Sequence, residues 1–135
     1  MTCGYISRDK LFAGPKGTFH IDDKFTWDSS GVVYAIQCTN ARCGHIYIGE
    51  TGRKLKERFR EHRQHVIKNT RDNEVASHFN QVGHNGVDDM SVLGLQYKAR
   101  LLTRKLDEQK IIAKLGCVLG QGGMNTDLNF PQLLN

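Results

Sequence analysis

The sequence predicts a small α+β domain built on a three-stranded, mostly antiparallel sheet flanked by helices. Three observations support this fold class: two short apolar runs joined by a polar loop, a third apolar run later in the chain, and stretches between and after them with helical spacing of apolar residues. The resulting order is strand, strand, helix, helix, strand, helix, which suits a sheet covered by helices. At 135 residues the chain has the length of one domain with a modest core.

The first two strands are expected at residues 32–37 and 46–49. The first begins with VVY, a β-branched and aromatic start that is typical of a buried strand. Residues 39–44 supply turn residues between the strands and are few enough for an antiparallel hairpin. Thr51 and Gly52 are expected to end the second strand.

A basic helix is expected over residues 53–68. Its apolar positions Leu55, Phe59 and Val66 are spaced by four and seven, and His62 fills the missing place in that stripe. The spacing predicts that the imidazole lies on the same face of the helix as the apolar residues.

The second half of the chain is expected to hold two helices and a strand. Residues 73–82 have a weaker helical pattern, and residues 85–89 indicate a loop. Residues 90–97 predict the third strand. Residues 100–115 have the clearest helical pattern in the chain, which ends at Gly116.

We expect three parts along the chain. Residues 1–30 show little periodicity and are interpreted as an N-terminal arm packed on the core, with Phe25 and Trp27 as anchors. Residues 31–126 are expected to form the domain, and residues 127–135 a C-terminal tail.

The positive charge of the chain is concentrated in one segment. The formal net charge is +5, and between residues 53 and 68 seven Lys or Arg residues stand beside only Glu57 and Glu61. Two interpretations stay open: a solvated helix face, or a surface that binds a polyanion, because clustered Lys and Arg neutralise phosphates. A membrane surface is disfavoured, since the segment has few large apolar residues. The basic residues expected to follow a polyanion are Arg53, Lys54, Lys56, Arg60 and Arg63.

Nothing in the sequence indicates a membrane or secreted protein. The longest apolar runs are too short to span a bilayer, and no secretory signal opens the chain. We therefore expect no membrane partner and no secretion.

The four cysteines are expected to be reduced or to bind metal, because they do not form a dense disulfide framework. Two of them stand as Cys38-x4-Cys43 between the expected strands, and His78-x5-His84 lies around the end of the second helix. Two thiolates on a hairpin and two imidazoles at a helix end could make a tetrahedral zinc site. The alternative is two buried thiols and two surface histidines.

Four polar side chains are expected to converge near the first two strands. Tyr34 and Tyr47 lie one on each strand, and Arg58 and His62 lie one turn apart on the following helix. Two phenols, a guanidinium and an imidazole brought together are suited to binding a phosphate. Each tyrosine could instead be a half-buried strand residue with a bonded hydroxyl, and His62 could be a core histidine.

Two further residues are expected on the same surface. Glu108 lies on the buried stripe of the last helix, and Asn125 follows in the segment GGMN. Glu108 could instead lie at the edge of the helix face or pair with Arg104 one turn earlier. Asn125 could simply cap a turn. The convergence of all six residues favours a functional site.

The order of these residues resembles the GIY-YIG nuclease family. The matching elements are VVY, then YIG, then Arg58 and His62 on the helix. Glu108, within RKLDEQKIIAKL, stands where the family has its metal-binding glutamate, and Asn125 resembles the asparagine of the family's last motif. The resemblance covers about residues 25–126. The first motif reads VVY rather than GIY, but its tyrosine is retained.

The Cys and His residues narrow the resemblance further. This CCHH insertion, with FTWDSSGVVY before it and YIGETGRKL after it, is similar to the nuclease domain of Penelope-like retroelements. The resemblance implies a structural zinc on Cys38, Cys43, His78 and His84, which would fasten the hairpin to the second helix.

The resemblance implies a DNA endonuclease that hydrolyses phosphodiester bonds with one divalent metal. Glu108 would be the only direct protein ligand of Mg²⁺ or Mn²⁺. Arg58 would hold the scissile phosphate, and Asn125 would orient the phosphate or the residues around it. Tyr34 is favoured as the base, with His62 and Tyr47 assisting, since a tyrosine needs nearby positive charge to act at neutral pH.

Two other function classes are also considered. One is a zinc-stabilised DNA-binding module without catalysis, and the other is a domesticated element used as a protein-interaction domain. For the nuclease, one active site cuts one strand, so a duplex break needs a homodimer or two events. A DNA substrate favours the nucleus over the cytoplasm.

Overall fold

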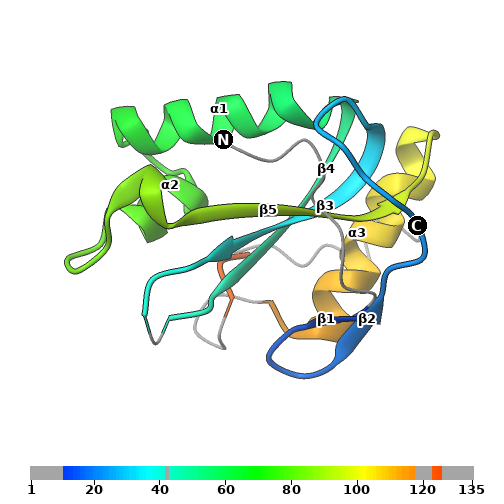
Figure 1. The fold of residues 1–135 in the computed structure, drawn as a ribbon, viewed down its shortest axis with the longest axis horizontal. Helices are drawn as coiled ribbons and strands as arrows, with labels where there is room; N and C mark the ends of the chain where they lie inside the picture. The colour runs from blue at the N-terminus through cyan, green and yellow to red at the C-terminus, as the bar shows by residue number, and fades with distance from the viewer. Residues whose placement is uncertain (1–10, 42, 118–122, 126–135) are drawn as a thin grey trace.

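The computed structural model describes residues 11–41, 43–117 and 123–125. The described elements follow one another along the chain as the strands and helices shown in Figure 1. They are β1 (Leu11–Ala13), β2 (Thr18–His20), β3 (Ser30–Cys38), β4 (Ile46–Lys54), α1 (Leu55–Lys68), α2 (Glu74–Phe79), η1 (Gly86–Asp89), β5 (Met90–Tyr97) and α3 (Leu101–Leu115).

The main sheet has three strands in the order β4-β3-β5, and both pairings are antiparallel. The predicted fold class is therefore confirmed. β3 is central and is buried along most of its length, as its β-branched start indicated. Its Tyr34 lies opposite Gly49 on β4 and Gly94 on β5.

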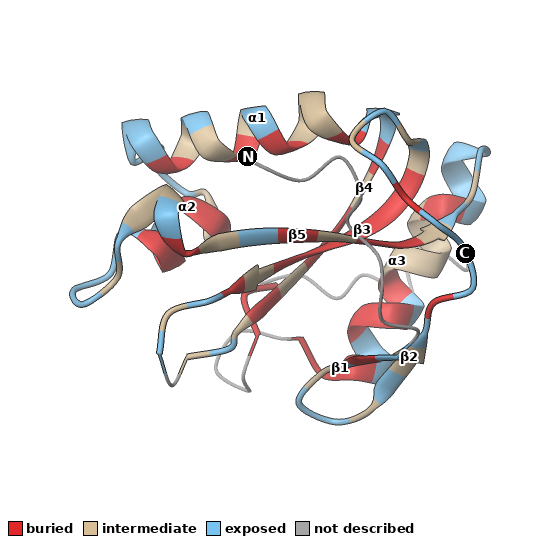
Figure 2. Ribbon diagram, viewed as in Figure 1, coloured by how far each residue is buried: buried red, intermediate tan, exposed pale blue. Residues whose placement is uncertain are grey.

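Helices cover both faces of this sheet, with α1 on one side and α3 on the other (Figure 1). The predicted stripe of α1 is confirmed, because Leu55, Phe59, His62 and Val66 are its buried residues. Figure 2 shows the buried side of α1 turned toward the sheet and its exposed side turned to solvent. His62 thus lies in the interior, beside the strands that carry the two tyrosines.

The predicted end of β4 and start of α1 were wrong. β4 continues through Lys54, and the helix begins at Leu55. The strand continues because β3 still offers partners there, and Gly52 allows a close approach of Arg104 rather than a turn. The first helical N–H groups donate to Ser29 O (2.8 Å) and Trp27 O (2.9 Å), so the arm caps the helix.

The second helix is shorter than predicted, ending at Phe79 rather than at residue 82. Asn73 caps its start by accepting from Ala76 N (2.8 Å). Asn80 Nδ2 donates to Val66 O (2.9 Å), which ties the chain to α1 at the end of the helix, and Val82 is fully exposed. The predicted loop at residues 85–89 contains a short 3₁₀ turn, η1.

The N-terminal segment contains a hairpin, β1–β2, that periodicity did not predict. Phe25 is fully buried and stacks on Tyr97 with ring centroids 4.6 Å apart. Trp27 packs on Phe59 at 5.6 Å. The division into arm, domain and tail stays a prediction, and residues 1–10, 118–122 and 126–135 lie outside the described residues. None of the described helices has the length and apolarity needed to cross a bilayer.

Candidate active site and metal centre

The centre of the site is a hydrogen bond between Tyr34 on β3 and His62 on α1. Tyr34 Oη lies 2.6 Å from His62 Nε2, and the two residues are 1% and 2% exposed. Gly49 leaves room for the phenol, since a Cβ there would overlap it. The glycine of the YIG segment is therefore required by packing against the tyrosine of the VVY segment.

Tyr47 on β4 joins the same group from its other side. Its ring meets His62 edge-on, with centroids 5.5 Å apart, and the Tyr34 ring does the same at 5.7 Å. Tyr47 is less buried than Tyr34. One imidazole thus contacts both phenols.

Arg58 contributes its charge from α1, one turn before His62. Its Nη1 donates to Glu61 Oε1 at 2.9 Å, and its side chain is 27% exposed. Arg53 Nη2 reaches the other oxygen of Glu61 at 2.6 Å. Both arginines are therefore held by one half-exposed carboxylate at the rim of the site.

Burial controls the protonation of the central groups. It raises the pKa of Tyr34 and of Tyr47 far above the usual value of a phenol, and the charge of Arg58 opposes this without overcoming it. Burial, assisted by the charge of Arg58, lowers the pKa of His62 to about 3. In the free protein both phenols and the imidazole are therefore uncharged at neutral pH.

Glu108 lies on α3, and its charge affects the protonation of Tyr34 and Tyr47. Burial and then the negative charge of Glu50 raise the pKa of Glu108 to about 7. The charge of Glu108 in turn raises the pKa of both Tyr34 and Tyr47. A partly buried carboxylate in this position is suited to binding a divalent cation. The positive charge of the cation would offset both the cost of burying the ionised carboxylate and its repulsion from Glu50.

The side-chain amide of Asn125 hydrogen-bonds to the backbone of Ile48. Its Oδ1 accepts from Ile48 N and its Nδ2 donates to Ile48 O, both at 2.9 Å. Met124 N also donates to Ile46 O, so residues 123–125 line the edge of β4. Asn125 is 5% exposed, and this geometry favours holding the strand between Tyr47 and Gly49 over contacting a phosphate.

The structure brings the four zinc-ligand candidates together. The ligand atoms of Cys38, Cys43, His78 and His84 all lie within 4.8 Å of one another. Both ring nitrogens of His84 are buried without a hydrogen-bond partner. Tetrahedral zinc with ligand bonds of about 2.0–2.3 Å needs donors only slightly closer together than this. The donor set therefore fits zinc.

Burial lowers the pKa of His78 to about 4, so its imidazole has the neutral form that binds metal. Burial also raises the pKa of Cys38 to about 12 in the metal-free protein. Zinc binding would therefore release a thiol proton there.

The family described as the GIY-YIG catalytic domain matches residues 30–104, which is 75 of the 135 residues. The chain belongs to the GIY-YIG family. The matched segment contains Tyr34, Tyr47, Arg58 and His62, while Glu108 and Asn125 lie beyond it. Membership indicates a nuclease. Neither the curated proteins nor the solved structures gave a match.

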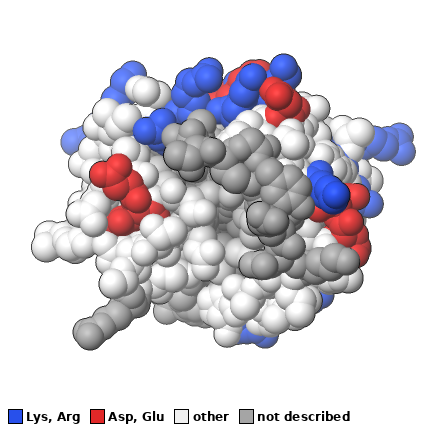
Figure 3. Space-filling view, in the orientation of Figure 1, with Lys and Arg blue, Asp and Glu red and all other residues white. Residues whose placement is uncertain are grey.

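Seven of the 19 Lys and Arg residues of this GIY-YIG protein lie in residues 53–68, and Figure 3 shows Lys and Arg side chains gathered over α1, with others elsewhere on the surface. Arg53 and Lys54 belong to β4 rather than to the helix. Lys54 and Lys56 lie 3.8 and 3.0 Å from Asp28, whereas Arg60 and Arg63 have no ion-pair partner within the described ranges. Arg60 is exposed and Arg63 partly so.

Sequence reasoning missed the acidic residues around Tyr47. Glu50 directly follows YIG, and its alternation with Tyr47 places it on the α3 face of β4. The charge of Glu74, at the start of α2, also raises the pKa of Tyr47. A single charged residue in the apolar run of β4 was the available signal for Glu50. No sequence pattern indicated Glu74, because its distance from Tyr47 depends on how α2 packs against the rest of the domain.

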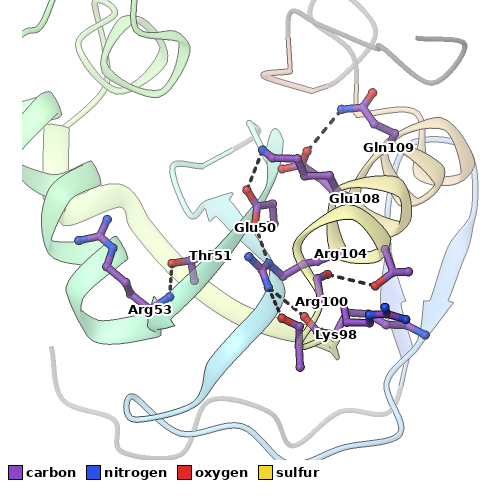
Figure 4. A network of polar contacts seen from close by, with 11 residues as sticks. Glu50, Thr51, Arg53, Lys98, Arg100, Arg104, Glu108 and Gln109 are labelled. Carbon is purple, nitrogen blue, oxygen red and sulfur yellow. Dashed lines mark hydrogen bonds and ion pairs between the residues drawn. The ribbon is translucent and has the colours of Figure 1, made fainter. Parts of the chain in front are cut away.

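The alternative pairing of Glu108 with Arg104 was wrong, because Arg104 pairs with Glu50 instead (Figure 4). Arg104 Nε lies 2.6 Å from Glu50 Oε1 across the contact between α3 and β4. Glu108, one turn later on α3, instead accepts a hydrogen bond from Gln109 Nε2 at 3.4 Å.

Proposed function

We propose that this GIY-YIG protein is a divalent-metal-dependent DNA endonuclease that hydrolyses phosphodiester bonds. The observation that carries the proposal is the convergence of Tyr34 and Tyr47 on His62, with the charges of Arg58 and Glu108 acting on both phenols. Phenols, a guanidinium and a carboxylate at one place can bind a phosphate, position a water and hold a cation.

Arg58 binds the scissile phosphate in this proposal. Its partner in the free protein, Glu61, is 38% exposed, and such surface ion pairs are weak. A phosphate can therefore replace Glu61 and form a charge-assisted, bidentate contact with the guanidinium. Once there, Arg58 offsets the extra negative charge that develops in the transition state.

Tyr34 is proposed as the base that takes a proton from the attacking water. As the water proton moves to Tyr34 Oη, the phenolic proton moves to His62 Nε2, 2.6 Å away. The phenol never becomes a buried phenolate, which its raised pKa would disfavour. Negative charge from bound DNA raises the pKa of His62 and makes it a better acceptor. Tyr47 assists by orienting the water.

Glu108 would hold the catalytic Mg²⁺ or Mn²⁺. The cation would supply charge stabilisation of the phosphate and of the leaving 3′ oxygen. Asn125 positions Tyr47 through its two hydrogen bonds to Ile48. The exposed cations on β4 and α1 follow the DNA backbone without reading bases.

We also propose a structural zinc on Cys38, Cys43, His78 and His84, as in the CCHH nuclease domains of Penelope-like retroelements. The closeness of these donors and the unpaired imidazole of His84 support it. The ion would join the β3–β4 hairpin to α2. All four positions would be filled by protein, which is typical of structural zinc.

Three further points are proposed, the first and the third from the nuclease assignment and the second from the similarity of the CCHH pattern to Penelope-like retroelements. Residues 31–126 act as the catalytic unit, a retroelement is the source of the domain, and the nucleus is its place of action. Cleavage of both strands requires two chains or two successive nicks.

The experiment is relaxation of supercoiled plasmid with and without Mg²⁺ or Mn²⁺, beside Glu108→Ala. Nicking that requires the metal and is lost in the folded variant supports the nuclease. Folded, zinc-loaded protein that binds DNA and never nicks it would support the non-catalytic binding module instead. Absence of salt-dependent DNA binding would favour an interaction domain.

A further inference from the structure

Glu50 forms ion pairs with two basic side chains, Arg104 and Lys105, which differ in how far they are buried. Its Oε1 lies 2.6 Å from Arg104 Nε, and its Oε2 lies 3.0 Å from Lys105 Nζ. Arg104 is 6% exposed, Glu50 14% and Lys105 45%. One carboxylate thus joins a buried cation to an exposed one on consecutive residues of α3.

Arg104 is committed to the fold. Besides Glu50, its guanidinium donates to Lys98 O (3.1 Å) and Ala99 O (3.0 Å), the carbonyls just before α3 (Figure 4). It is also packed against Gly52 of β4. This buried side chain is held by three acceptors, and its role is to fix α3 against β4.

Lys105 is differently placed, since nearly half of its side chain is open to solvent. An ammonium has three donors, and Glu50 is the partner of one of them. An ion pair this exposed is screened by solvent and is readily exchanged for another anion. Glu50 therefore orients the Lys105 ammonium and leaves it able to donate to another anion.

Lys105 also lies beside the proposed metal ligand. It precedes Glu108 by three residues on α3, a spacing that puts both side chains on neighbouring positions of one face. Its charge lowers the pKa of Glu108, in agreement with that closeness. Arg58 approaches the tyrosines from α1, so the two cations come from helices on opposite faces of the sheet.

We propose that Lys105 is an additional DNA phosphate-binding residue of the active site, held ready by Glu50 on the α3 side. It contacts a backbone phosphate at the Glu108 side of the site, while Arg58 contacts the scissile phosphate from α1. This inference rests on the proposed function, because it takes the ligand to be DNA. It assigns a residue outside the basic segment of β4 and α1.

The test measures DNA binding in a Glu108→Gln background, so that cleavage does not interfere. Dissociation constants for a short duplex are measured between about 50 and 200 mM salt for Lys105→Met, for Lys105→Arg and for the control Lys110→Met. Lys110 is an exposed lysine of the same helix. Loss of one phosphate contact lowers the slope of log affinity against log salt by about 0.9. The Glu108→Gln parent therefore loses roughly three- to fourfold more affinity over that range than Lys105→Met does.

Lys105→Arg is expected to keep the parental slope, and Lys110→Met to leave it unchanged. In the Glu108 protein, Lys105→Met slows single-turnover nicking and Lys105→Arg restores it. A Lys105→Met protein with the parental slope and nicking rate would overturn the inference while leaving the nuclease intact. If the protein with Glu108 intact binds DNA but never nicks it with Mg²⁺ or Mn²⁺, the proposed function fails, and a Lys105-dependent slope still assigns the phosphate contact.

Discussion

Replacing Asn125 by leucine tests whether this residue holds the strand or contacts the substrate. The side chain makes two hydrogen bonds to Ile48, both 2.9 Å long and both buried. Leucine has a similar volume and can make neither bond. The substitution therefore leaves one N–H and one C=O of β4 unpaired next to Tyr47.

The cost follows from those two groups. A buried polar group left without a partner costs about 1–3 kcal/mol, so two of them lower the free energy of unfolding by about 2–6 kcal/mol. For a domain of this size, that corresponds to a fall in Tm of roughly 10 °C or more. A residue that only contacts a phosphate would change stability by much less, within about 0.5 kcal/mol.

The assay is urea unfolding monitored by circular dichroism, with Asn85→Leu as a matched control. Asn85 is exposed, and its side-chain amide makes one long contact of 3.4 Å to Asp89. We expect a large loss of stability for Asn125→Leu and a small one for the control. Unchanged stability of Asn125→Leu together with lost DNA cleavage would refute the reasoning and make Asn125 a substrate contact.

Three other outcomes follow from the site. Arg58→Ala is expected to lower the single-turnover nicking rate by about 100-fold or more, as for loss of a transition-state donor, with a smaller loss of DNA affinity; loss of affinity alone would make Arg58 an anchor. Metal analysis is expected to find one zinc per chain, and a strong chelator to lower Tm by roughly 10 °C or more; zinc-free protein with the same Tm would contradict the zinc site. His62, with its pKa lowered to about 3, adds stability that is complete above pH 6.5 and is lost as pH falls toward 3, so about 2 kcal/mol should be lost by pH 5. His62→Gln should remove that part of the pH dependence in urea titrations at pH 7 and pH 5, and an unchanged slope would contradict a buried neutral histidine.

The fold class could be predicted because it depends on local patterns. The apolar stripe of α1 and the run of β5 (Met90–Tyr97) specify their own secondary structure and buried face. Boundaries were wrong where distant partners decide them. β4 runs on to Lys54 because β3 offers partners there, and the carbonyls of Ser29 and Trp27 determine where α1 starts.

The site likewise has features that follow from local spacing and features that depend on tertiary packing. Arg58 and His62 share a helix, and the two tyrosines share a hairpin, so their convergence could be predicted from spacing. The role of Asn125 depends on its fit against Ile48, and the pairing of Arg104 with Glu50 depends on how α3 meets β4. Neither contact leaves a periodic signal in the sequence. Charges that are distant in sequence, such as Glu50 beside Lys105, become visible only in the packed molecule.

The most direct test of the nuclease assignment is the rate at which zinc-loaded protein nicks supercoiled plasmid in Mg²⁺, compared with Glu108→Gln under the same conditions. Both proteins must be folded and must bind the plasmid, which circular dichroism and gel shift establish. We predict Mg²⁺-dependent nicking by the parent and a loss of at least about 100-fold in the variant, because the metal would lose the negative charge of its protein ligand. Equal nicking by the two proteins would contradict the placement of the catalytic metal at Glu108.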